Sequence, residues 1–386
     1  MTAKLRIPGK AAAAALALLL ALACCAQAAA EKVITLTFAG DCVIGCEENA
    51  HGRPDSFDSA VKKNGYDYFF AGFRDLFAAD DCTVVNLQGV LADTNSGAAK
   101  SRSIRYRGAE EYVKILQAGS VEAVSLCNNH TMDYSRHGLE NTKRVLEEAG
   151  IGWAMEQDLW IFEKDGIRIA LVSIDYGAYH RSREKIRSAL QDLRDSGEIN
   201  AAVFLIHEGR EFLPTHQQRQ EEFGEYAVQK AGAELVIMHQ AHVLQGIRIL
   251  ENRGIFYSLG NFVYGGDSTV QKGKNSDTRL TMAVQARLYF TESGVCTGRQ
   301  LILYPAWSSG TDPKNNYQPR RMTAKEAEAV LAAVQADTDF RLPEIRTDEY
   351  GYAFVQLDYL GDGTTAGNPS EGGPEPPAPQ PGRESR

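Results

Sequence analysis

Polar side chains able to bind a metal ion or move a proton follow several of the apolar, β-branched runs of this sequence. Four of the eight histidines lie at such run ends, with an aspartate and an asparagine: Asp41, Asn129, His130, His207, His239 and His242. A lone histidine after a strand is usually structural, but repetition at successive strand ends favours one shared site. Carboxylate and amide oxygens combined with imidazoles suit divalent ions such as Zn²⁺, Mn²⁺ or Fe²⁺. Such ions polarise a substrate oxygen and lower the pKa of a bound water to about 7, so the pattern predicts metal-assisted hydrolysis.

These residues need a sheet that brings the strand ends together. Runs typical of strands occur at 33–39, 82–87, 121–126, 167–174, 202–206 and 234–238. Helical patterns lie between them at 66–78, 110–118, 136–149, 184–194 and 216–231. This alternation predicts an α/β sheet with ligands outside the carboxyl ends of its strands. Later runs near 254–258, 280–290 and 299–304 lack long intervening helices and predict a second, more antiparallel sheet.

The two ends of the chain differ from the rest in composition. Three basic residues precede an apolar run over 11–23 and then small residues, which predicts a secretory signal peptide over 1–30. An uncleaved membrane anchor and a lipid-modified Cys24 or Cys25 remain alternatives. Residues 361–386 contain six of the thirteen prolines and predict a disordered tail, which leaves 31–360 as one domain. We therefore expect an exported protein of the cell envelope or extracellular space.

The charge balance limits the partners. The 386 residues carry 41 Lys and Arg against 50 Asp and Glu, a net charge of −9, which argues against a nucleic-acid partner. The basic run over 100–107 is a local exception, so Arg105 and Arg107 are candidates for binding an anionic substrate; a solvated loop is the alternative. Five cysteines lie beyond residue 30, and pairing of Cys42 with Cys46 is left open.

Six motifs occur in order along the chain and together resemble the CapA family, the poly-gamma-glutamate capsule synthesis proteins. They are Phe38-Ala39-Gly40-Asp41, Asn86-Leu87-Gln88, Asn128-Asn129-His130-Thr131-Met132-Asp133-Tyr134, His207-Glu208-Gly209-Arg210-Glu211, His239-Gln240-Ala241-His242-Val243-Leu244-Gln245-Gly246 and Ser258-Leu259-Gly260-Asn261-Phe262. The resemblance covers roughly residues 33–305. It implies the fold of calcineurin-like metallophosphoesterases, an α/β sandwich of two mixed β-sheets flanked by helices.

The resemblance also implies roles for residues at the matching positions. The implied ligands for one or two ions of Mn, Zn or Fe are Asp41, Gln88, Asn129, His207, His239 and His242. His130 would stabilise developing negative charge or protonate the leaving group. Asp133 would orient His130, although an N-cap for a helix starting near Ser135 is an equally good interpretation. Asn261, in the last motif, joins the two arginines as a candidate for substrate binding.

Two positions depart from the family pattern. The family usually has glutamate where this chain has Gln88. A carboxylate between two ions about 3.5–4 Å apart offsets their repulsion, which a neutral amide cannot do, so we expect one tightly held ion or weak occupancy of a second position. The family also typically has a basic residue where this chain has Cys46.

The resemblance implies a role in biosynthesis or processing of a cell-surface polymer such as poly-gamma-glutamate. The implied partners are an anionic polymer or small phosphoester substrate and a membrane-bound capsule synthesis complex. Metal-assisted hydrolysis is the expected reaction. The alternative is a non-catalytic component of a capsule assembly or export complex that keeps a degenerate metal site, because a fold does not fix an activity.

Overall fold

The computed structural model describes residues 32–270 and 277–361. The predicted signal peptide lies outside the described residues, as does the predicted tail after Gly361. The strands are β1 (Lys32–Val43), β2 (Cys46–Glu47), β3 (Cys82–Leu87), β4 (Val90–Leu91), β5 (Tyr106–Gly108), β6 (Ala123–Ser125), β7 (Gly152–Ala154), β8 (Trp160–Lys164), β9 (Ile167–Asp175), β10 (Ala201–His207), β11 (Leu235–His239), β12 (Ile247–Leu250), β13 (Arg253–Phe256), β14 (Asn261–Tyr264), β15 (Leu280–Phe290), β16 (Cys296–Trp307), β17 (Arg320–Arg321), β18 (Arg346–Thr347) and β19 (Ala353–Gly361). The α-helices are α2 (Phe57–Asn64), α3 (Arg74–Phe77), α4 (Val113–Ala118), α5 (Ser135–Glu148), α6 (Tyr176–Asp195), α7 (Gln218–Glu225) and α8 (Ala324–Gln335), with short helical turns η1 (Tyr66–Tyr68), η2 (Glu110–Tyr112) and η3 (Tyr226–Lys230).

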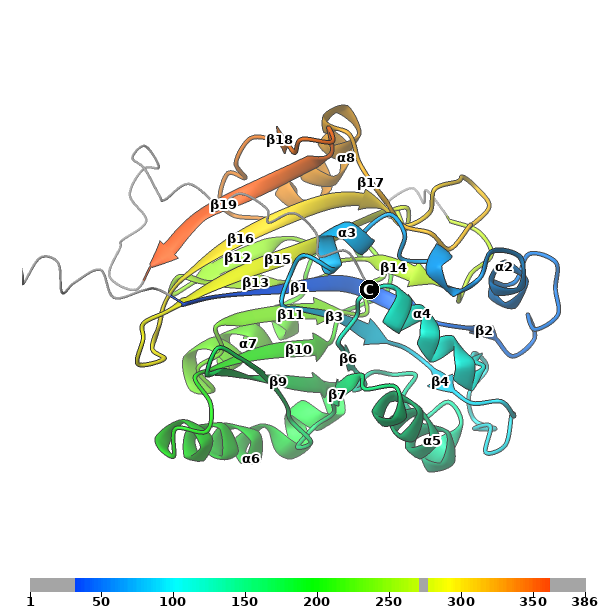
Figure 1. Ribbon diagram of the computed structural model, residues 1–386, viewed down its shortest axis with the longest axis horizontal. Helices are drawn as coiled ribbons and strands as arrows, with labels where there is room; N and C mark the ends of the chain where they lie inside the picture. The colour runs from blue at the N-terminus through cyan, green and yellow to red at the C-terminus, as the bar shows by residue number, and fades with distance from the viewer. Residues whose placement is uncertain (1–31, 271–276, 362–386) are drawn as a thin grey trace, which may run out of the picture.

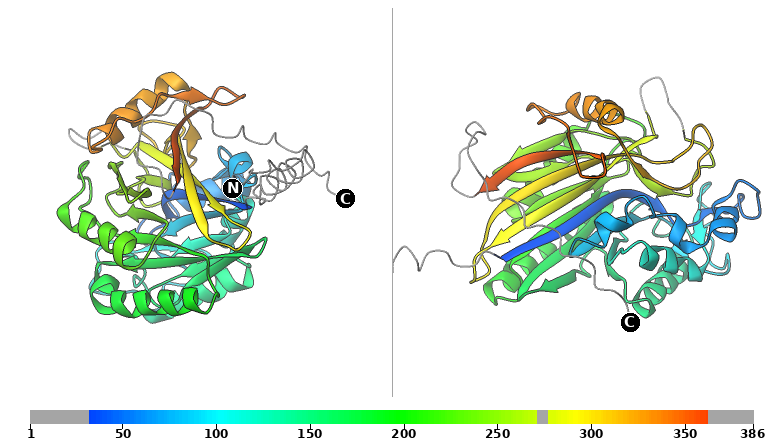
Figure 2. Two further views of the ribbon diagram at one scale, coloured as in Figure 1. Left: turned by 90° about the vertical axis from the view of Figure 1, so that its left-hand side faces the viewer. Right: turned by 45° about the horizontal axis from the view of Figure 1, so that its top comes forward.

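Two large mixed sheets form the body of the protein. The ten-stranded sheet runs β18-β19-β16-β15-β1-β3-β6-β7, with β14 paired to β1 and β17 to β16. The six-stranded sheet runs β12-β13-β11-β10-β9-β8, and β2, β5 and β4 form a small third sheet. Figures 1 and 2 show the large sheets stacked, with α6 outside the six-stranded sheet and α8 on the far side of the molecule. The predicted α/β sandwich of two mixed sheets flanked by helices is therefore confirmed.

The core lies between and outside these sheets because side chains alternate along each strand. On β1, Ile34, Leu36 and Phe38 belong to one buried cluster with residues of β9, β10 and β11 from the other sheet. On the other face of this sheet, Ala39 of β1 and Val85 of β3 belong to a second buried cluster with the aromatic side chains around α3. Phe73, for example, packs edge-on against Phe262 at 4.9 Å between ring centroids. This packing fixes the position of β1 between two layers.

Two predictions of local structure differ from what is observed. The expected helix over 66–78 is broken into η1 and α3, because the chain turns where Gly72 packs against the carbonyl of Pro319. A Cβ on Gly72 would lie 2.5 Å from that oxygen, a contact between distant segments that local periodicity does not reveal. The later strands form no separate antiparallel sheet: β15 and β16 extend the sheet of β1, whereas β13 pairs with β11.

The strand ends that carry the candidate residues are therefore divided between two sheets. Strands β1 and β3 are parallel neighbours in the ten-stranded sheet, and β10 and β11 are parallel neighbours in the six-stranded sheet. The carboxyl edges of both pairs meet at the site described below. None of the helices within 32–270 and 277–361 is long and apolar enough to cross a membrane.

Candidate functional site

The site is built around Asp41, which is fully buried near the end of β1. The register of β1 shifts on both sides of Asp41, so the strand is irregular there. Asp41 lies opposite Asn86 of β3 and opposite Asn261 of β14. The backbones pack closely enough that a Cβ on Gly40 would lie 2.1 Å from the Gly260 carbonyl oxygen. This close approach joins the two backbones, and the Asp41 N–H donates to the Gly260 carbonyl, just before β14, at 2.9 Å.

Histidines from the second sheet surround this carboxylate. His207 and His239 are neighbours in register at the ends of β10 and β11. Asp41 Oδ1 lies 3.4 Å from His239 Nδ1, and Asp41 Oδ2 lies 3.3 Å from His242 Nδ1. Asn86 Nδ2 donates to Asp41 Oδ1 at 2.7 Å and lies 3.2 Å from His207 Nδ1. His207 Nε2 is 3.1 Å from Asn129 Oδ1, which joins the loop after β6 to the site.

We call this set of side chains from both sheets the Asp41 cluster. Its members are Asp41, Asn86, Asn129, His207, His239, His242 and Asn261. The structure thus brings together five of the six predicted metal ligands and one of the predicted substrate-binding residues. Asn86 was not predicted as a site residue.

The turn after β11 holds His242, a member of the Asp41 cluster, and the neighbouring Gln240 in a strained conformation. Gln240 and His242 have positive φ angles of 91° and 58°. Such angles are costly for residues other than glycine and concentrate at functional sites. The turn lets the Gln240 N–H donate to Asp41 Oδ2 at 3.3 Å and brings His242 Nδ1 within 2.8 Å of Asn261 Oδ1.

The electrostatics of the cluster favour an ionised carboxylate among mostly neutral imidazoles. Burial opposes ionisation of Asp41, but the His242 hydrogen bond and the nearby histidines outweigh it and hold the pKa of Asp41 far below its usual range. Burial lowers the pKa of His207 to about 3 and also lowers the pKa of His239. Burial opposes protonation of His242 as well, but its hydrogen bond to Asp41 dominates and raises its pKa.

This donor set fits a divalent cation. Asp41 supplies a carboxylate in the ionised form, and His207 and His239 are in the neutral form that binds metal. His239 Nδ1 is buried and makes no hydrogen bond within the described residues, so its lone pair is available to a ligand. Buried polar atoms are normally paired, which makes this atom a specific indication of a missing partner.

His130 and Asp133 form a second feature beside the cluster. His130 Nδ1 lies 2.8 Å from Asp133 Oδ2, and the same oxygen accepts the Tyr106 N–H at 2.7 Å. The Tyr106 ring packs on the His130 ring at 4.3 Å between centroids. Helix α5 has Tyr134 as its N-cap residue, without a side-chain cap, so Asp133 holds His130 and does not cap the helix. A carboxylate accepts hydrogen bonds, so Nδ1 of His130 carries a proton and Nε2 is left for other partners.

The remaining predicted residues are placed differently. Gln88 is 2% exposed, and neither amide atom has a hydrogen-bond partner among the described residues. Arg105 donates to the carbonyls of Ala99 and Arg102, and Arg107 bonds to Glu48 and to the Ala92 carbonyl. Both guanidinium groups thus have partners within the protein, and no contact joins them to the Asp41 cluster in the described part of the chain.

A cavity of about 290 Å³ opens beside the cluster. Its lining residues are Asn129, Asp175, Tyr176, His207, Glu208, Gly209, Arg219 and Gln240. Arg219 supplies positive charge there: its side chain is about half exposed, pairs with the buried Glu208 at 2.6 Å and stacks 4.8 Å over the Tyr176 ring. Arg219 lies within the helical segment predicted over 216–231, and nothing in the sequence pointed to it.

The chain matches the model of a known protein family. The family model described as "Bacterial capsule synthesis protein PGA_cap" matches residues 35–265, more than half of the chain. The chain belongs to this family. The matched region contains every member of the Asp41 cluster.

Individual relatives are distant. The chain is similar to the PGA biosynthesis protein CapA of Bacillus subtilis (strain 168), 23% identical over 255 residues covering 61% of this chain and 64% of that protein. The capsule biosynthesis protein CapA of Bacillus anthracis is 24% identical over 255 residues, covering 60% of each chain. The chain therefore spans about three fifths of the length of these relatives.

The solved structures that match the chain are distant as well. A hypothetical protein from Thermus thermophilus has a TM-score of 0.41 at 13% identity, covering 70% of this chain and 99% of its own. The calcineurin-like phosphoesterase YfkN from Bacillus subtilis has a TM-score of 0.36 at 11% identity, covering 75% of this chain and 88% of its own.

Proposed function

We propose that this PGA_cap protein acts in the synthesis or processing of an anionic cell-surface polymer of the poly-gamma-glutamate type, as a metal-dependent hydrolase. The observation that carries the proposal is the convergence of His207, His239 and His242 on the buried Asp41 carboxylate. The names of the Bacillus CapA relatives support the polymer, and the donor set supports the hydrolysis. We further propose that the protein is exported, as its amino-terminal sequence predicts.

The Asp41 cluster would hold the ion, with Asp41, His207 and His239 as its principal ligands and Asn129 beside them. A bound divalent ion supplies Lewis-acid activation of water and of the substrate oxygen. Asn86 fixes the rotamer of Asp41 through its 2.7 Å hydrogen bond. In its imidazolium form, His130 would keep Nδ1–H on Asp133 and donate the Nε2 proton to the leaving group of a phosphoester or a gamma-glutamyl amide.

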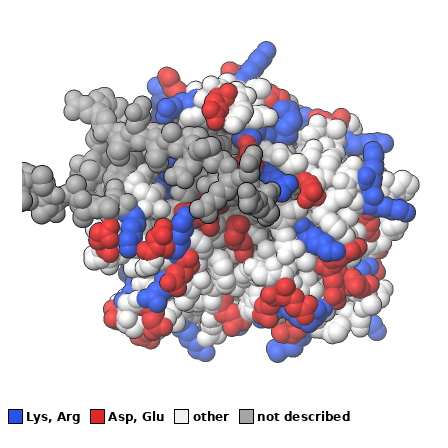
Figure 3. Space-filling model, viewed as in Figure 1, with Lys and Arg blue, Asp and Glu red and all other residues white. Residues whose placement is uncertain are grey.

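Recognition of an anionic substrate would be local. On the face shown in Figure 3, acidic and basic side chains of the described residues are intermixed, so a polyanion meets no broad basic surface there. Arg219 at the mouth of the cavity is suited to a phosphate or carboxylate group, because a guanidinium binds such groups through two hydrogen bonds. Its pairing with Glu208 keeps it in position and partly balances its charge.

One observation favours a second candidate function, a non-catalytic component of a capsule assembly complex. Gln88 supplies no charge where the family usually has a carboxylate. Nothing at this position would offset the repulsion between two bound ions. The strained turn at Gln240 and His242 argues against the non-catalytic candidate, because strained backbone is costly and concentrates at functional sites.

A substrate panel with the metal-loaded full-length protein tests the hydrolase. We expect cleavage of a phosphodiester or a gamma-glutamyl oligomer by the wild type and a loss of about 10²–10⁴-fold in His130→Gln, the range for removal of a general acid. The Arg144→Gln variant, on the exposed face of α5, is a matched surface control. Activity unaffected by His130→Gln would refute the role of His130 as the proton donor, whereas absence of activity on the whole panel despite bound metal would favour the non-catalytic candidate.

A further inference from the structure

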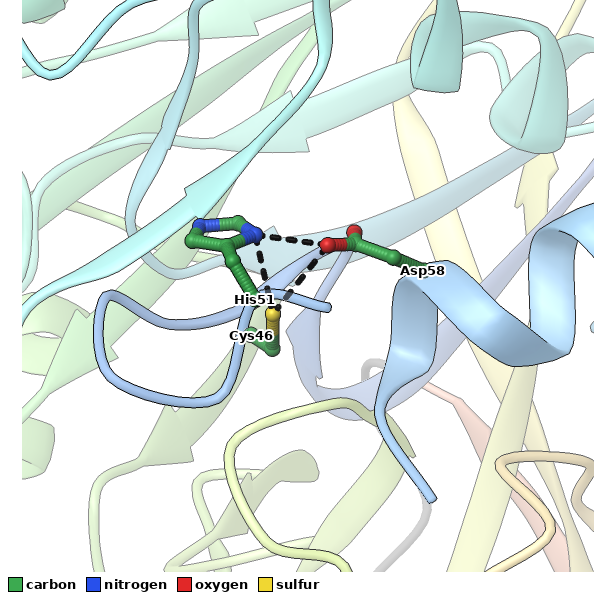
Figure 4. Close-up of side chains that lie close together, drawn as sticks. All are labelled: Cys46, His51 and Asp58. Atoms are coloured by element: carbon green, nitrogen blue, oxygen red, sulfur yellow. Dashed lines mark hydrogen bonds and ion pairs between the residues drawn. The ribbon is translucent and has the colours of Figure 1, made fainter. Parts of the chain in front are cut away.

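A second cluster of metal-binding side chains lies outside the Asp41 cluster. Cys46 is on β2, His51 is in the turn that follows, and Asp58 is in the first turn of α2. Figure 4 shows the three side chains pointing toward one another. Cys46 Sγ lies 3.3 Å from His51 Nδ1 and 3.7 Å from Asp58 Oδ2, and His51 Nδ1 lies 2.6 Å from Asp58 Oδ2.

The arrangement differs from a nucleophilic triad. A triad uses both ring nitrogens of the histidine, one toward the nucleophile and the other toward the carboxylate. Here the thiol and the carboxylate reach the same nitrogen, Nδ1. A single proton on Nδ1 can form a hydrogen bond to only one of the two partners. The three atoms therefore lie close together but cannot pass a proton from the thiol through the ring to the carboxylate. Convergence of three ligand atoms on one point is what a metal ion requires.

The surroundings prepare each group for this role. The Tyr112 hydroxyl donates to Asp58 Oδ1 at 2.8 Å, which leaves Oδ2 directed at the cluster. Burial opposes ionisation of Asp58, but its hydrogen bonds from His51 and Tyr112 outweigh it and keep its pKa below the usual value. Cys46 is 1% exposed; burial, and then the Asp58 charge, raises the pKa of its thiol to about 12. A cation between these groups would offset both the burial of the thiolate and its repulsion by the Asp58 carboxylate.

The far nitrogen of His51 gives an independent indication. His51 Nε2 is buried and has no hydrogen-bond partner in the described residues, although Glu48 Oε2 lies 3.9 Å away. If Nδ1 binds a metal, the ring proton resides on Nε2 and faces Glu48. A carboxylate behind a metal-binding histidine is the usual outer support of such sites.

We propose that Cys46, His51 and Asp58 bind a Zn²⁺-class transition-metal ion at a site separate from the Asp41 cluster. A thiolate, an imidazole and a carboxylate are Zn²⁺ ligands, and three protein ligands leave a fourth position for water. Ligand atoms of a tetrahedral Zn²⁺ site are about 3.3–3.6 Å apart, from bond lengths of about 2.0–2.3 Å. Two of the three separations are already close to this, and only the His51–Asp58 hydrogen bond has to open.

Binding involves proton transfer without a change of oxidation state. The S–H bond of Cys46 breaks, its proton leaves to solvent, and the sulfur lone pair forms the bond to the ion. The Nδ1 proton of His51 passes to Nε2 by way of solvent. The ion would tie β2 to α2 and fix the loop over residues 48–56 between them. Strand β2 pairs with β5, and Tyr106 of β5 packs on His130 beside the Asp41 cluster. The bound ion would therefore also stabilise the position of His130.

Cobalt titration of the metal-stripped full chain tests the proposal. We expect a thiolate-to-Co²⁺ charge-transfer band in the wild type and in the His239→Ala/His242→Ala double variant, because no cysteine belongs to the Asp41 cluster. Cys46→Ser should lose the band, whereas Cys296→Ala, a matched control on β16, should keep it. Since Cys46→Ser could misfold, His51→Ala in the partly exposed loop gives a second reading, and we expect it to weaken Co²⁺ binding at this site at least 100-fold.

Each outcome decides the question. Absence of the band in the wild type, its persistence in Cys46→Ser, or wild-type Co²⁺ affinity in His51→Ala would overturn the proposal. Loss of the band only in the His239→Ala/His242→Ala double variant would overturn it as well, since the thiolate would then belong to the other site.

Discussion

Replacing Gln88 by methionine should stabilise the metal-free protein. Both amide atoms of Gln88 are buried without a hydrogen-bond partner within the described residues. An unsatisfied buried amide costs about 1–3 kcal/mol, whereas methionine has a similar length and no such group. We therefore expect Gln88→Met to raise the free energy of unfolding by about 1–3 kcal/mol, measured by urea denaturation in the presence of a chelator.

Gln220 provides the matched control. It is also fully buried, but its Nε2 donates to Gln245 Oε1 at 2.8 Å and to the Tyr257 carbonyl at 3.1 Å, and its Oε1 accepts the Gln217 N–H at 3.0 Å. Gln220→Met should lower the free energy of unfolding by at least about 2 kcal/mol, because these partners are left unpaired. If Gln88→Met is destabilised as much as Gln220→Met, Gln88 serves the fold and the reasoning from its unpaired amide is refuted.

Other perturbations separate the remaining roles. Asp133→Asn turns two charge-assisted hydrogen bonds, from Tyr106 N–H and from His130, into neutral ones and should lower the free energy of unfolding by about 1–3 kcal/mol, measured in urea; an unchanged midpoint would contradict the contact. Arg219→Ala should raise KM for an anionic substrate with little change in kcat, and equal losses in both would assign Arg219 to the transition state instead. Burial opposes protonation of His216, but the Asp337 carboxylate outweighs burial and raises the His216 pKa. The His216–Asp337 pair therefore contributes its full stabilisation below about pH 6.5, and this contribution is lost as the pH rises through the raised pKa of His216. The stability advantage of wild type over Asp337→Asn should therefore shrink with rising pH in denaturation series, and a pH-independent difference would contradict the assignment.

The sequence located the strand ends well because the pattern there is local. The strand over 82–87 and the strand over 280–290 were predicted with their observed bounds, since each is a β-branched or apolar run with polar flanks. The polar residues near the carboxyl ends of β1, β10 and β11 and in the loop after β6 were predicted to meet, and they do. Their division between two sheets could not be predicted, because strand order depends on contacts between distant segments.

The residues that sequence reasoning missed depend on such distant contacts. Asn86 stands in a motif that drew attention to Gln88, yet Asn86 is the residue in register with Asp41. An amide side chain inside an otherwise β-branched and apolar run was the available signal for Asn86. His51 gave none, since its contacts with Cys46 and Asp58 require the loop after β2 to fold back on α2.

The metal content of the purified full-length protein is the most direct test of the Asp41 cluster. Elemental analysis of the wild type should find at least one equivalent of a divalent transition metal more than in the His239→Ala/His242→Ala double variant, with both proteins folded by circular dichroism. Equal metal content in the two folded proteins would contradict a metal ion at Asp41, and with it the proposed hydrolysis.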